Sequence, residues 1–246
     1  MNFFITSNMC TCFKQNGEII PCKMNNLNKI IDQLKNRIKK YGKFVFVASN
    51  PNGYEKTDSY AYTTKKSFEI CDMFFDEFIV LDNRNFKDAK NIINNADLIF
   101  LAGGHVPTQN VFFEKIKLKQ NLQYFDGVII GQSAGAMNLS DNVYNYPEDE
   151  SELNDPKFLK GLGLSPITII PHYEKGTGNT HSQGINILED YFLPDSINNN
   201  FIAITDGSHI LIEENSILLC GEIYQINNGK IMQICEHKKQ CFYNKK

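Results

Sequence analysis

The chain has 246 residues, of which 42% are hydrophobic and 22% are charged, and its formal net charge is −3. A chain of this length can form one large α/β domain that buries on the order of 70–75% of its unfolded surface. The charge balance excludes the strongly basic surface that nucleic-acid binding needs, and no apolar run approaches the roughly 18 residues of a membrane-spanning helix. We therefore expect one domain over residues 1–246 that binds neither nucleic acid nor a membrane.

The seven cysteines are an odd number, which indicates free thiols rather than a disulfide framework. The first residues, 1–7, read as a strand and lack the basic start and long apolar core of a secretory signal. Both features predict a cytoplasmic protein. Cys10, Cys12 and Cys22 lie close in sequence, but their spacing fits no zinc pattern, so we expect neither a metal nor another cofactor.

Strand-like and helix-like segments alternate over the first two thirds of the chain. Short apolar runs predict strands at 3–6, 44–48, 78–81, 98–102, 128–130 and 167–170. Helical periodicity or helix-compatible composition predicts helices at 27–38, 59–75, 88–96, 107–118 and 181–192. This alternation predicts a doubly wound, mostly parallel sheet of the α/β class.

The last quarter of the chain has a different pattern. Short strand-like runs at 201–205, 210–213, 217–220, 222–226 and 230–234 are separated by turn signals such as Asp206-Gly207 and Asn228-Gly229. They predict a C-terminal β-meander, or hairpins, packed on the main sheet. The longest break is the acidic segment 141–157, and loops of this kind lie over the carboxyl ends of parallel strands, where ligands bind.

The most informative motif is a G-x-S-x-G pattern, Gly131-Gln132-Ser133-Ala134-Gly135, between an apolar run and a helix-compatible segment. This pattern is typical of a nucleophile elbow, a sharp strand-to-helix turn that exposes a serine hydroxyl. The residues two before and two after the serine approach each other closely, so a Cβ at either position would collide. Ser133 is therefore the candidate nucleophile, and the alternative is a tight turn with a buried serine.

A nucleophilic serine needs a base, an orienting acid and donors for an oxyanion. His172 is the best candidate base because it follows a predicted strand, as Ser133 does, and strand ends of a parallel sheet share one edge. His105 is the second choice, and His209 and His237 are expected to be structural or solvated. The backbone N–H groups of Ala134 and of the Gly103-Gly104 turn are the candidate oxyanion donors. The acid remains open among the acidic residues Asp141, Glu148, Asp149, Glu150, Glu152 and Asp155.

Five motifs in order along the chain carry a resemblance to a known family. They are Ala48-Ser49-Asn50-Pro51, Leu101-Ala102-Gly103-Gly104, Gly131-Gln132-Ser133-Ala134-Gly135-Ala136, Ile170-Pro171-His172-Tyr173 and Ile204-Thr205-Asp206-Gly207-Ser208. Over roughly residues 43–235 the chain resembles the peptidase E and cyanophycinase family of serine peptidases. This resemblance implies the class I glutamine amidotransferase-like, flavodoxin-like fold.

The resemblance also implies roles for individual residues. It implies Ser133 as the nucleophile, His172 as the base, and Gly103 or Gly104 with Ala134 as oxyanion donors. The spacing of the acid after the serine in this family falls on Glu148, and a small insertion would move the role to Asp149 or Glu150. The implied substrates are short peptides or peptide-like amides, and a homodimer remains open as the assembly.

One position departs from the family pattern. Aspartyl dipeptidases of this group carry an arginine after a threonine to hold the substrate carboxylate, whereas here Thr180 is followed by His181. A histidine that is mostly neutral near pH 7 cannot supply the bidentate grip of arginine. We therefore expect His181 to contact the substrate and the protein to be poor on Asp-X dipeptides.

Two other functions stay open from the sequence alone. A non-peptidase hydrolase of the α/β-hydrolase type also uses a nucleophile elbow, although it usually has a longer chain between the serine and the histidine. A catalytically silent binding or sensing protein on the same scaffold is the alternative from a different class. An amidotransferase proper needs cysteine where this chain has Ser133.

Overall fold

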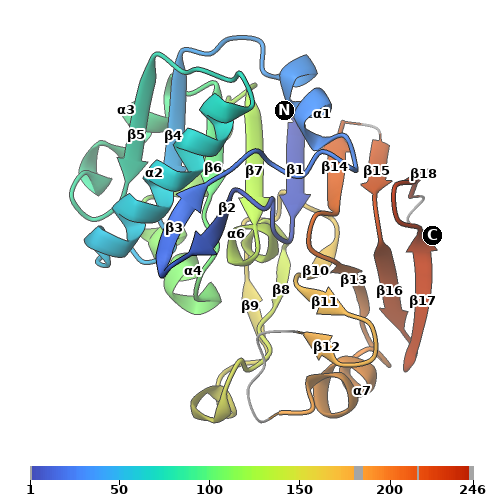
Figure 1. Cartoon of the computed structure of the whole chain (residues 1–246). Coiled ribbons are helices and arrows are strands. Elements are labelled where there is room, and N and C mark those ends of the chain that lie inside the picture. The colour runs from blue at the N-terminus through green and yellow to red at the C-terminus, as the bar shows by residue number, and fades with distance from the viewer. Residues whose placement is uncertain (1, 180–184, 215, 244–246) are drawn as a thin grey trace.

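The computed structural model describes residues 2–179, 185–214 and 216–243 (Figure 1). Its main sheet has a parallel half in the order β1-β7-β6-β4-β5. These strands are β1 (Asn2–Thr6), β4 (Lys43–Val47), β5 (Glu77–Leu81), β6 (Leu98–Leu101) and β7 (Val128–Gln132). All five were predicted from apolar runs, and their register places Thr6, Leu101 and Gln132 together at the carboxyl edge of the sheet.

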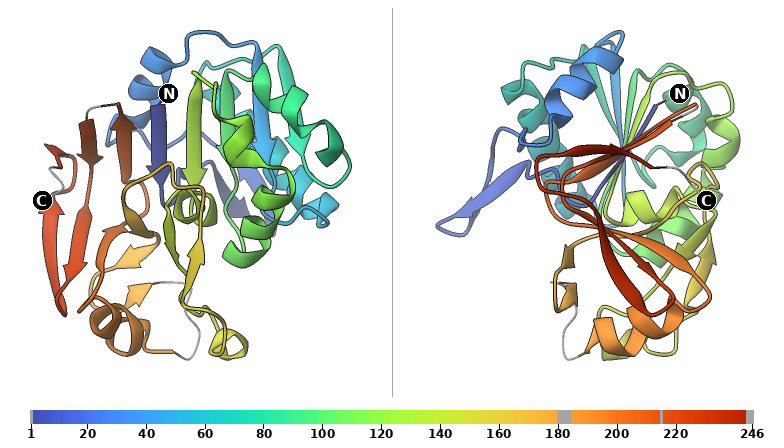
Figure 2. Two further views of the ribbon diagram at one scale, coloured as in Figure 1. Left: turned by 180° about the vertical axis from the view of Figure 1, so that it is seen from behind. Right: turned by 90° about the vertical axis from the view of Figure 1, so that its right-hand side faces the viewer.

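Helices cover both faces of this sheet, as expected for a doubly wound fold. Helices α1 (Ile30–Arg37) and α2 (Tyr54–Ile70) lie on one face, and α3 (Ala89–Asn94), α4 (Val106–Lys115), α5 (Leu118–Asn121) and α6 (Ala134–Asn138) on the other (Figures 1 and 2). Alternation along β4 explains why both faces are covered. Phe44 and Phe46 pack under α1 and α2, whereas Val45 and Val47 pack under α3 and α4.

The predicted C-terminal strands are present, but they belong to two sheets. They are β13 (Asn200–Ile204), β14 (His209–Glu213), β15 (Ser216–Cys220), β16 (Ile223–Asn227), β17 (Lys230–Cys235) and an additional β18 (Gln240–Phe242). The hairpin β14–β15 extends the main sheet beyond β1, followed by β18. A second sheet has the order β10-β13-β16-β17, in which β10 (Thr168–Ile170) is parallel to β13. Of the two arrangements expected for the tail, hairpins are present, and they are divided between two sheets instead of packing on the main sheet alone.

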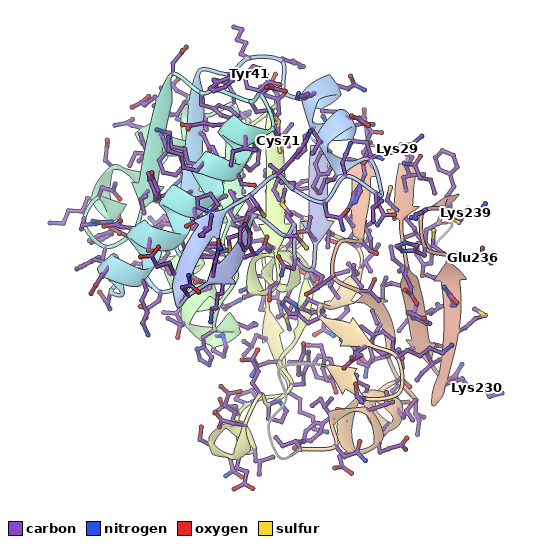
Figure 3. All side chains as sticks on the ribbon, in the orientation of Figure 1. Lys29, Tyr41, Cys71, Lys230, Glu236 and Lys239 are labelled. Carbon is purple, nitrogen blue, oxygen red and sulfur yellow. The ribbon has the colours of Figure 1, made fainter. Side chains whose placement is uncertain are left out.

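Burial explains this division of the tail. Ile202 and Ile204 of β13 pack with the core of the main sheet, whereas Phe201 and Ala203 pack with a separate cluster around Phe192. A strand that is buried on both faces needs cover on both sides, and the second sheet lies between these two clusters. The outer edges carry charge: Lys230, Glu236 and Lys239 lie exposed along β17 and the turn that follows it (Figure 3).

Several elements differ from the sequence expectations. An exposed hairpin of β2 (Cys12–Gln15) and β3 (Glu18–Pro21) was not predicted and projects from the body (Figure 2). The acidic break contains β8 (Asn142–Tyr144), which pairs with β9 (Phe158–Lys160), and the short 3-10 helix η2 (Glu150–Glu152). Strands β11 (Tyr173–Glu174) and β12 (Gly178–Asn179) form a further pair.

Helix boundaries shift by several residues in two places. Helix α2 begins five residues before the expected start at 59, and the expected helix at 88–96 is preceded by the 3-10 turn η1 (Phe86–Asp88). The expected helix at 181–192 falls partly outside the described residues, and the helical part is η3 (Leu188–Phe192) with α7 (Leu193–Asp195). Within the described part of the chain, none of the helices combines the length and apolar character that crossing a membrane requires.

Candidate active site

Ser133 lies at a sharp turn between β7 and α6. Its backbone has φ 50° and ψ −114°, an unusual conformation for a residue with a side chain. A backbone hydrogen bond to β1 stabilises the turn, because the N–H of Ser133 donates to the carbonyl oxygen of Thr6 at 2.9 Å. The side chain is thereby placed at the carboxyl edge of the parallel sheet.

The two glycines of the motif are required by close backbone contacts. A Cβ on Gly131 would lie 2.8 Å from the carbonyl oxygen of Gly135. A Cβ on Gly135 would collide with the backbone carbonyl of Leu101 in the neighbouring strand. The close approach expected between the two glycines is therefore confirmed at Gly131, whereas at Gly135 the contact that excludes a Cβ is with Leu101 of β6.

His172 meets Ser133 as expected, although it comes from the other sheet. Its Nε2 lies 2.9 Å from Ser133 Oγ. His172 follows β10 in the second sheet and has φ 54°, so a positive φ occurs at both catalytic candidates. The imidazole is mostly buried, with 13% of its side-chain surface exposed. The two groups can exchange a proton without rearrangement.

Asp206 lies beside His172 Nδ1, the place where a serine hydrolase needs an orienting acid. Its Oδ1 lies 2.9 Å from His172 Nδ1. Asp206 belongs to the turn between β13 and β14, where the chain crosses from the second sheet to the main sheet. Because Ile170 of β10 pairs with Ala203 of β13, the segments that follow these two parallel strands emerge side by side. Partial burial opposes ionisation of Asp206, but hydrogen bonds from His172 and Ser7 outweigh it and hold the pKa of this carboxyl below its usual value.

Ser7 connects the base to the acid. Its fully buried hydroxyl donates to Asp206 Oδ1 at 2.6 Å and accepts from the backbone N–H of His172 at 2.6 Å. The neighbouring Asn8 accepts from Gly207 N–H at 3.0 Å, and Met9 N–H donates to the Gln132 side chain at 3.3 Å. The segment after β1 therefore contacts the serine turn, the histidine and the aspartate turn together.

Glu148, the acid expected from the sequence, lies in the wall of the pocket that holds Ser133 and His172. The hydrogen bonds of His172 Nδ1 join it to Asp206 and Ser7. Loss of surrounding water and the nearby charge of Glu152 raise the pKa of the Glu148 carboxyl. The structure thus separates the two carboxylates: one orients the imidazole, and the other faces the space beside it.

The two alternative acids are placed away from the imidazole by local structure. Asp149 caps η2, because its carboxylate accepts from the N–H and the hydroxyl of Ser151 at 2.7 and 2.6 Å. Glu150 begins that short helix and lines a separate hollow with Lys157 and Tyr191. Neither arrangement brings a carboxylate to His172 Nδ1.

The glycine turn expected for oxyanion binding lies beside Ser133. A Cβ on Gly103 would lie 3.2 Å from Ser133 Cβ, a tight contact that would press on the serine side chain. The N–H of Gly103 donates to the Tyr60 hydroxyl over a long 3.4 Å, and that hydroxyl also accepts from Gln132 Nε2 at 2.7 Å. Burial raises the pKa of Tyr60, which keeps it a neutral phenol. Ala134, the other expected donor, is the first residue of α6.

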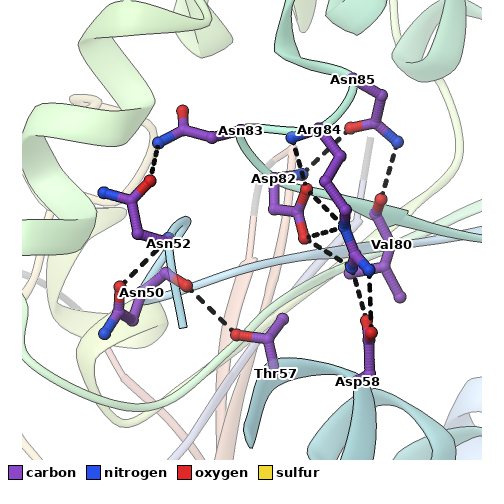
Figure 4. Close-up of polar contacts among 9 residues, drawn as sticks. All are labelled: Asn50, Asn52, Thr57, Asp58, Val80, Asp82, Asn83, Arg84 and Asn85. Carbon is purple, nitrogen blue, oxygen red and sulfur yellow. Dashed lines mark hydrogen bonds and ion pairs between the residues drawn. The ribbon is translucent and has the colours of Figure 1, made fainter. Parts of the chain in front are cut away.

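A polar network fixes the loop next to this glycine turn (Figure 4). Gly104 has φ 148° and packs against the side chain of Ser49, which begins the loop between β4 and α2. Arg84 joins the buried Asp82 to Asp58 of α2, with Nε–Oδ2 at 2.9 Å and Nη1–Oδ2 at 2.8 Å respectively. Asn83, which follows β5, donates to Asn52 of the β4–α2 loop, and Thr57 of α2 donates to the Asn50 carbonyl of that loop. These contacts hold the pocket wall at Gly104 in place.

The remaining histidines have separate roles. His105 caps α4 by accepting from Thr108 N–H at 3.3 Å, lines the same pocket, and contacts Glu152 at 3.4 Å. His209 is fully buried against Gln33, and burial lowers its pKa to about 3, as suits a neutral structural histidine. His181, the expected substrate contact, lies outside the described residues.

Sequence reasoning missed Asp206 and Ser7 as parts of this site. Asp206 stood within one of the family motifs, but the Asp-Gly pair was interpreted only as a turn signal. Ser7 follows the first strand, at the same edge as Ser133, and that position was the available signal.

The chain is similar to known proteins in family and in fold. Peptidase family S51 matches over residues 21–220. A peptidase from an acI-B1 actinobacterium is 14% identical, with a TM-score of 0.62 over 98% of this chain and 96% of that chain. A putative peptidase E protein from Listeria monocytogenes EGD-e is 17% identical, with a TM-score of 0.58 over 89% of this chain and 96% of that chain. The comparison with curated protein sequences gives no significant match.

At these identities the two structures show a shared fold, which confirms the expected class I glutamine amidotransferase-like α/β architecture. The family match covers most of the chain and includes the positions of Ser133, His172 and Asp206. The chain belongs to peptidase family S51, the family of peptidase E, and is a serine-type peptidase.

Proposed function

We propose that this peptidase hydrolyses short peptides, dipeptides among them, through Ser133, His172 and Asp206. The observation that supports this proposal is one continuous series of contacts, with 2.9 Å from Ser133 Oγ to His172 Nε2 and 2.9 Å from Nδ1 to Asp206. Ser133 then stands on a nucleophile elbow, and Asp206 takes the role that the sequence assigned to Glu148.

In the first half of the reaction, Ser133 Oγ attacks the scissile carbonyl carbon while His172 Nε2 takes the hydroxyl proton. The carbonyl oxygen becomes an oxyanion beside the N–H groups of Gly103 and Ala134. The Gly103 contact with Tyr60 is long enough to be exchanged for this oxygen. His172 then gives its proton to the leaving amine, and an acyl-enzyme remains on Ser133.

In the second half, water enters where the amine left. His172 accepts a proton from this water as its oxygen attacks the acyl carbon, and returns the proton to Ser133 Oγ. Asp206 keeps the Nδ1 proton in place throughout and stabilises the imidazolium that forms twice in each cycle. No other group needs to gain or lose a proton.

A cytoplasmic location is part of this proposal. All seven cysteines are free thiols in the structure, which suits a reducing compartment.

The test is a panel of dipeptides and tripeptides assayed with the native chain and with Ser133→Ala. We expect hydrolysis by the native chain and a fall in kcat of about 10⁵-fold or more in the variant, because the nucleophile is absent. A fluorophosphonate probe should label the native chain alone. If the folded native chain is neither labelled nor active, the silent binding protein is the correct function, and activity on esters alone would favour the non-peptidase hydrolase.

A further inference from the structure

The pocket in front of Ser133 has an uneven charge distribution. It encloses about 430 Å³, and its wall includes Ser133, His172, Tyr60 and Gln132. Glu148 provides the one carboxylate among the described residues that line this pocket, and that lining includes neither lysine nor arginine. Apart from the two histidines, the described part of the pocket lining therefore offers a bound peptide a single charged side chain, and its charge is negative.

The neighbouring acidic residues are already engaged. Glu152 accepts from the backbone N–H of Glu148 at 2.8 Å and contacts His105 Nε2 at 3.4 Å. Asp149 is bound to Ser151 as the cap of its short helix. In contrast, within the described chain the carboxylate of Glu148 makes no hydrogen bond or ion pair, so its acceptor capacity is available to a ligand.

The surroundings of this carboxylate favour a cation. Loss of surrounding water and, after it, the charge of Glu152 disfavour the ionised form of Glu148, and the two nearby histidines offset this only in part. A positively charged group placed here would relieve the unfavourable charge and form a charge-assisted hydrogen bond. A negatively charged substrate group would meet two carboxylates close together.

We propose that Glu148 is a specificity-determining residue that binds a positively charged nitrogen of the substrate. This inference rests on the proposed function, because it concerns the pocket in which Ser133 would attack a peptide. Two sources can supply the charge: the α-ammonium of a peptide whose first residue occupies the pocket, or the side chain of lysine or arginine in that residue. The second source predicts that this pocket disfavours an aspartyl side chain.

The test measures binding without turnover, in the full chain carrying Ser133→Ala. Calorimetric titration would compare norleucyl-alanine amide with its N-acetyl form, and N-acetyl-lysyl-alanine amide with N-acetyl-norleucyl-alanine amide. We expect at least tenfold tighter binding for the charged member of one pair or of both. The first pair reports on the α-ammonium and the second on a cationic side chain.

The same titrations with Glu148→Gln added should remove the preference for the charged peptide. Asp149→Asn is the matched control, because it removes the same charge one residue away and keeps the oxygen that accepts from Ser151. We expect the control to keep the tenfold preference. Loss of the preference in both variants would mean that the overall charge of the acidic segment, and not Glu148, attracts the peptide.

The inference is overturned if neither pair shows a preference, if no peptide binds, or if the preference survives in Glu148→Gln. Its failure can be distinguished from failure of the proposed function. A Glu148-dependent preference in a protein whose native form does not hydrolyse peptides would refute the catalytic proposal and leave the binding role. Hydrolysis without any such preference would refute the binding role of Glu148 and leave the catalytic proposal.

Discussion

The proposed catalytic machinery has two halves, the turn that carries Ser133 and the pair formed by His172 and Asp206. They come from different parts of the molecule and depend on different kinds of contact. The serine half depends on residues within a few positions of Ser133 and on its contact with the adjacent strand. The histidine and aspartate half depends on the parallel pairing of β10 with β13, whose residues are about thirty positions apart in the chain. Local sequence therefore specifies the position of Ser133, whereas long-range strand pairing specifies the positions of His172 and Asp206.

Ser7 is the point at which the two halves meet. It follows β1, which pairs with β7 on the serine side and with β14 on the side of the aspartate turn. Its hydroxyl bridges His172 and Asp206 within the second half. The first strand thus sets the distance between the halves. Substitutions in the serine half and in the histidine and aspartate half should therefore have distinguishable effects on kcat and stability.

Among substitutions of the residues around Ser133, the largest effect is expected from Asp206→Asn. An asparagine amide that donates to Nδ1 would leave the proton on Nε2, where the imidazole cannot accept the proton of Ser133. We expect kcat on a dipeptide to fall by about 10⁴-fold with little change in fold. Glu148→Gln, by contrast, should raise KM for cationic substrates more than it lowers kcat. Steady-state kinetics with both variants decide between the two carboxylates, and a larger fall in kcat for Glu148→Gln would restore the sequence-based assignment.

Gly135→Ala should damage the serine half by a steric route. The added Cβ would collide with the Leu101 carbonyl and displace the turn that carries Ser133. A displacement of about 1 Å lowers kcat by about 10²-fold, and overpacking of this kind costs about 3 kcal/mol of unfolding free energy. Kinetics and urea unfolding would measure both effects.

Gly17→Ala is the control for that substitution. Gly17 lies in the turn of the exposed hairpin, where a Cβ meets open space at φ 84°. It should cost about 1–2 kcal/mol for its backbone conformation and leave kcat unchanged. Equal losses of activity in the two variants would show that Leu101 does not hold the turn.

The sequence predicted the serine half almost completely. Apolar runs identified the five parallel strands, and the G-x-S-x-G spacing identified Ser133 and the close contact between Gly131 and Gly135. These features are encoded over a few residues, because strand burial and turn sterics act over short distances in the chain. The contact of His172 with Ser133 was also predicted, but for a reason that the structure replaces: the two residues do not share the edge of one sheet.

The histidine and aspartate half was harder to predict because it depends on which strands pair. The tail was expected as a β-meander or hairpins on the main sheet, whereas its chain crosses between two sheets at Thr205–Ser208, and this crossing brings Asp206 to His172. Hydrophobic patterning gives the strands but not their partners, since any of the apolar runs could pair with any other. The spacing implied by the family resemblance pointed to Glu148, which lies in the same pocket in a different environment.

Ser7→Ala tests the connection between the halves. Without the hydroxyl, Asp206 loses one donor and the His172 backbone N–H loses its acceptor. We expect kcat to fall about tenfold with KM nearly unchanged, the equivalent of one hydrogen bond to a charged group. Ser67→Ala is a matched control, since Ser67 is also fully buried and donates a 2.6 Å hydrogen bond, to Cys22. The Ser67→Ala variant should lose about 1 kcal/mol of unfolding free energy and keep the native kcat. If Ser7→Ala and Ser67→Ala have the same kcat, Ser7 is only a structural residue.

The smallest expected effects are opposite pH dependences of stability for the two carboxylates. The folded pKa of Asp206 lies below its usual 3.8, so its carboxylate stabilises the fold above pH 3.8 and this contribution is lost as the pH falls through the folded pKa. The folded pKa of Glu148 lies above its usual 4.5, so its contribution is full below pH 4.5 and is lost as the pH rises through the folded pKa. Relative to the native chain, Asp206→Asn should therefore lose stability from pH 3 to 7, and Glu148→Gln should gain it, in urea unfolding across that range. The same sign for both would mean that the two carboxylates share one environment, and the assignment of one to the imidazole and the other to the substrate would lose its electrostatic basis.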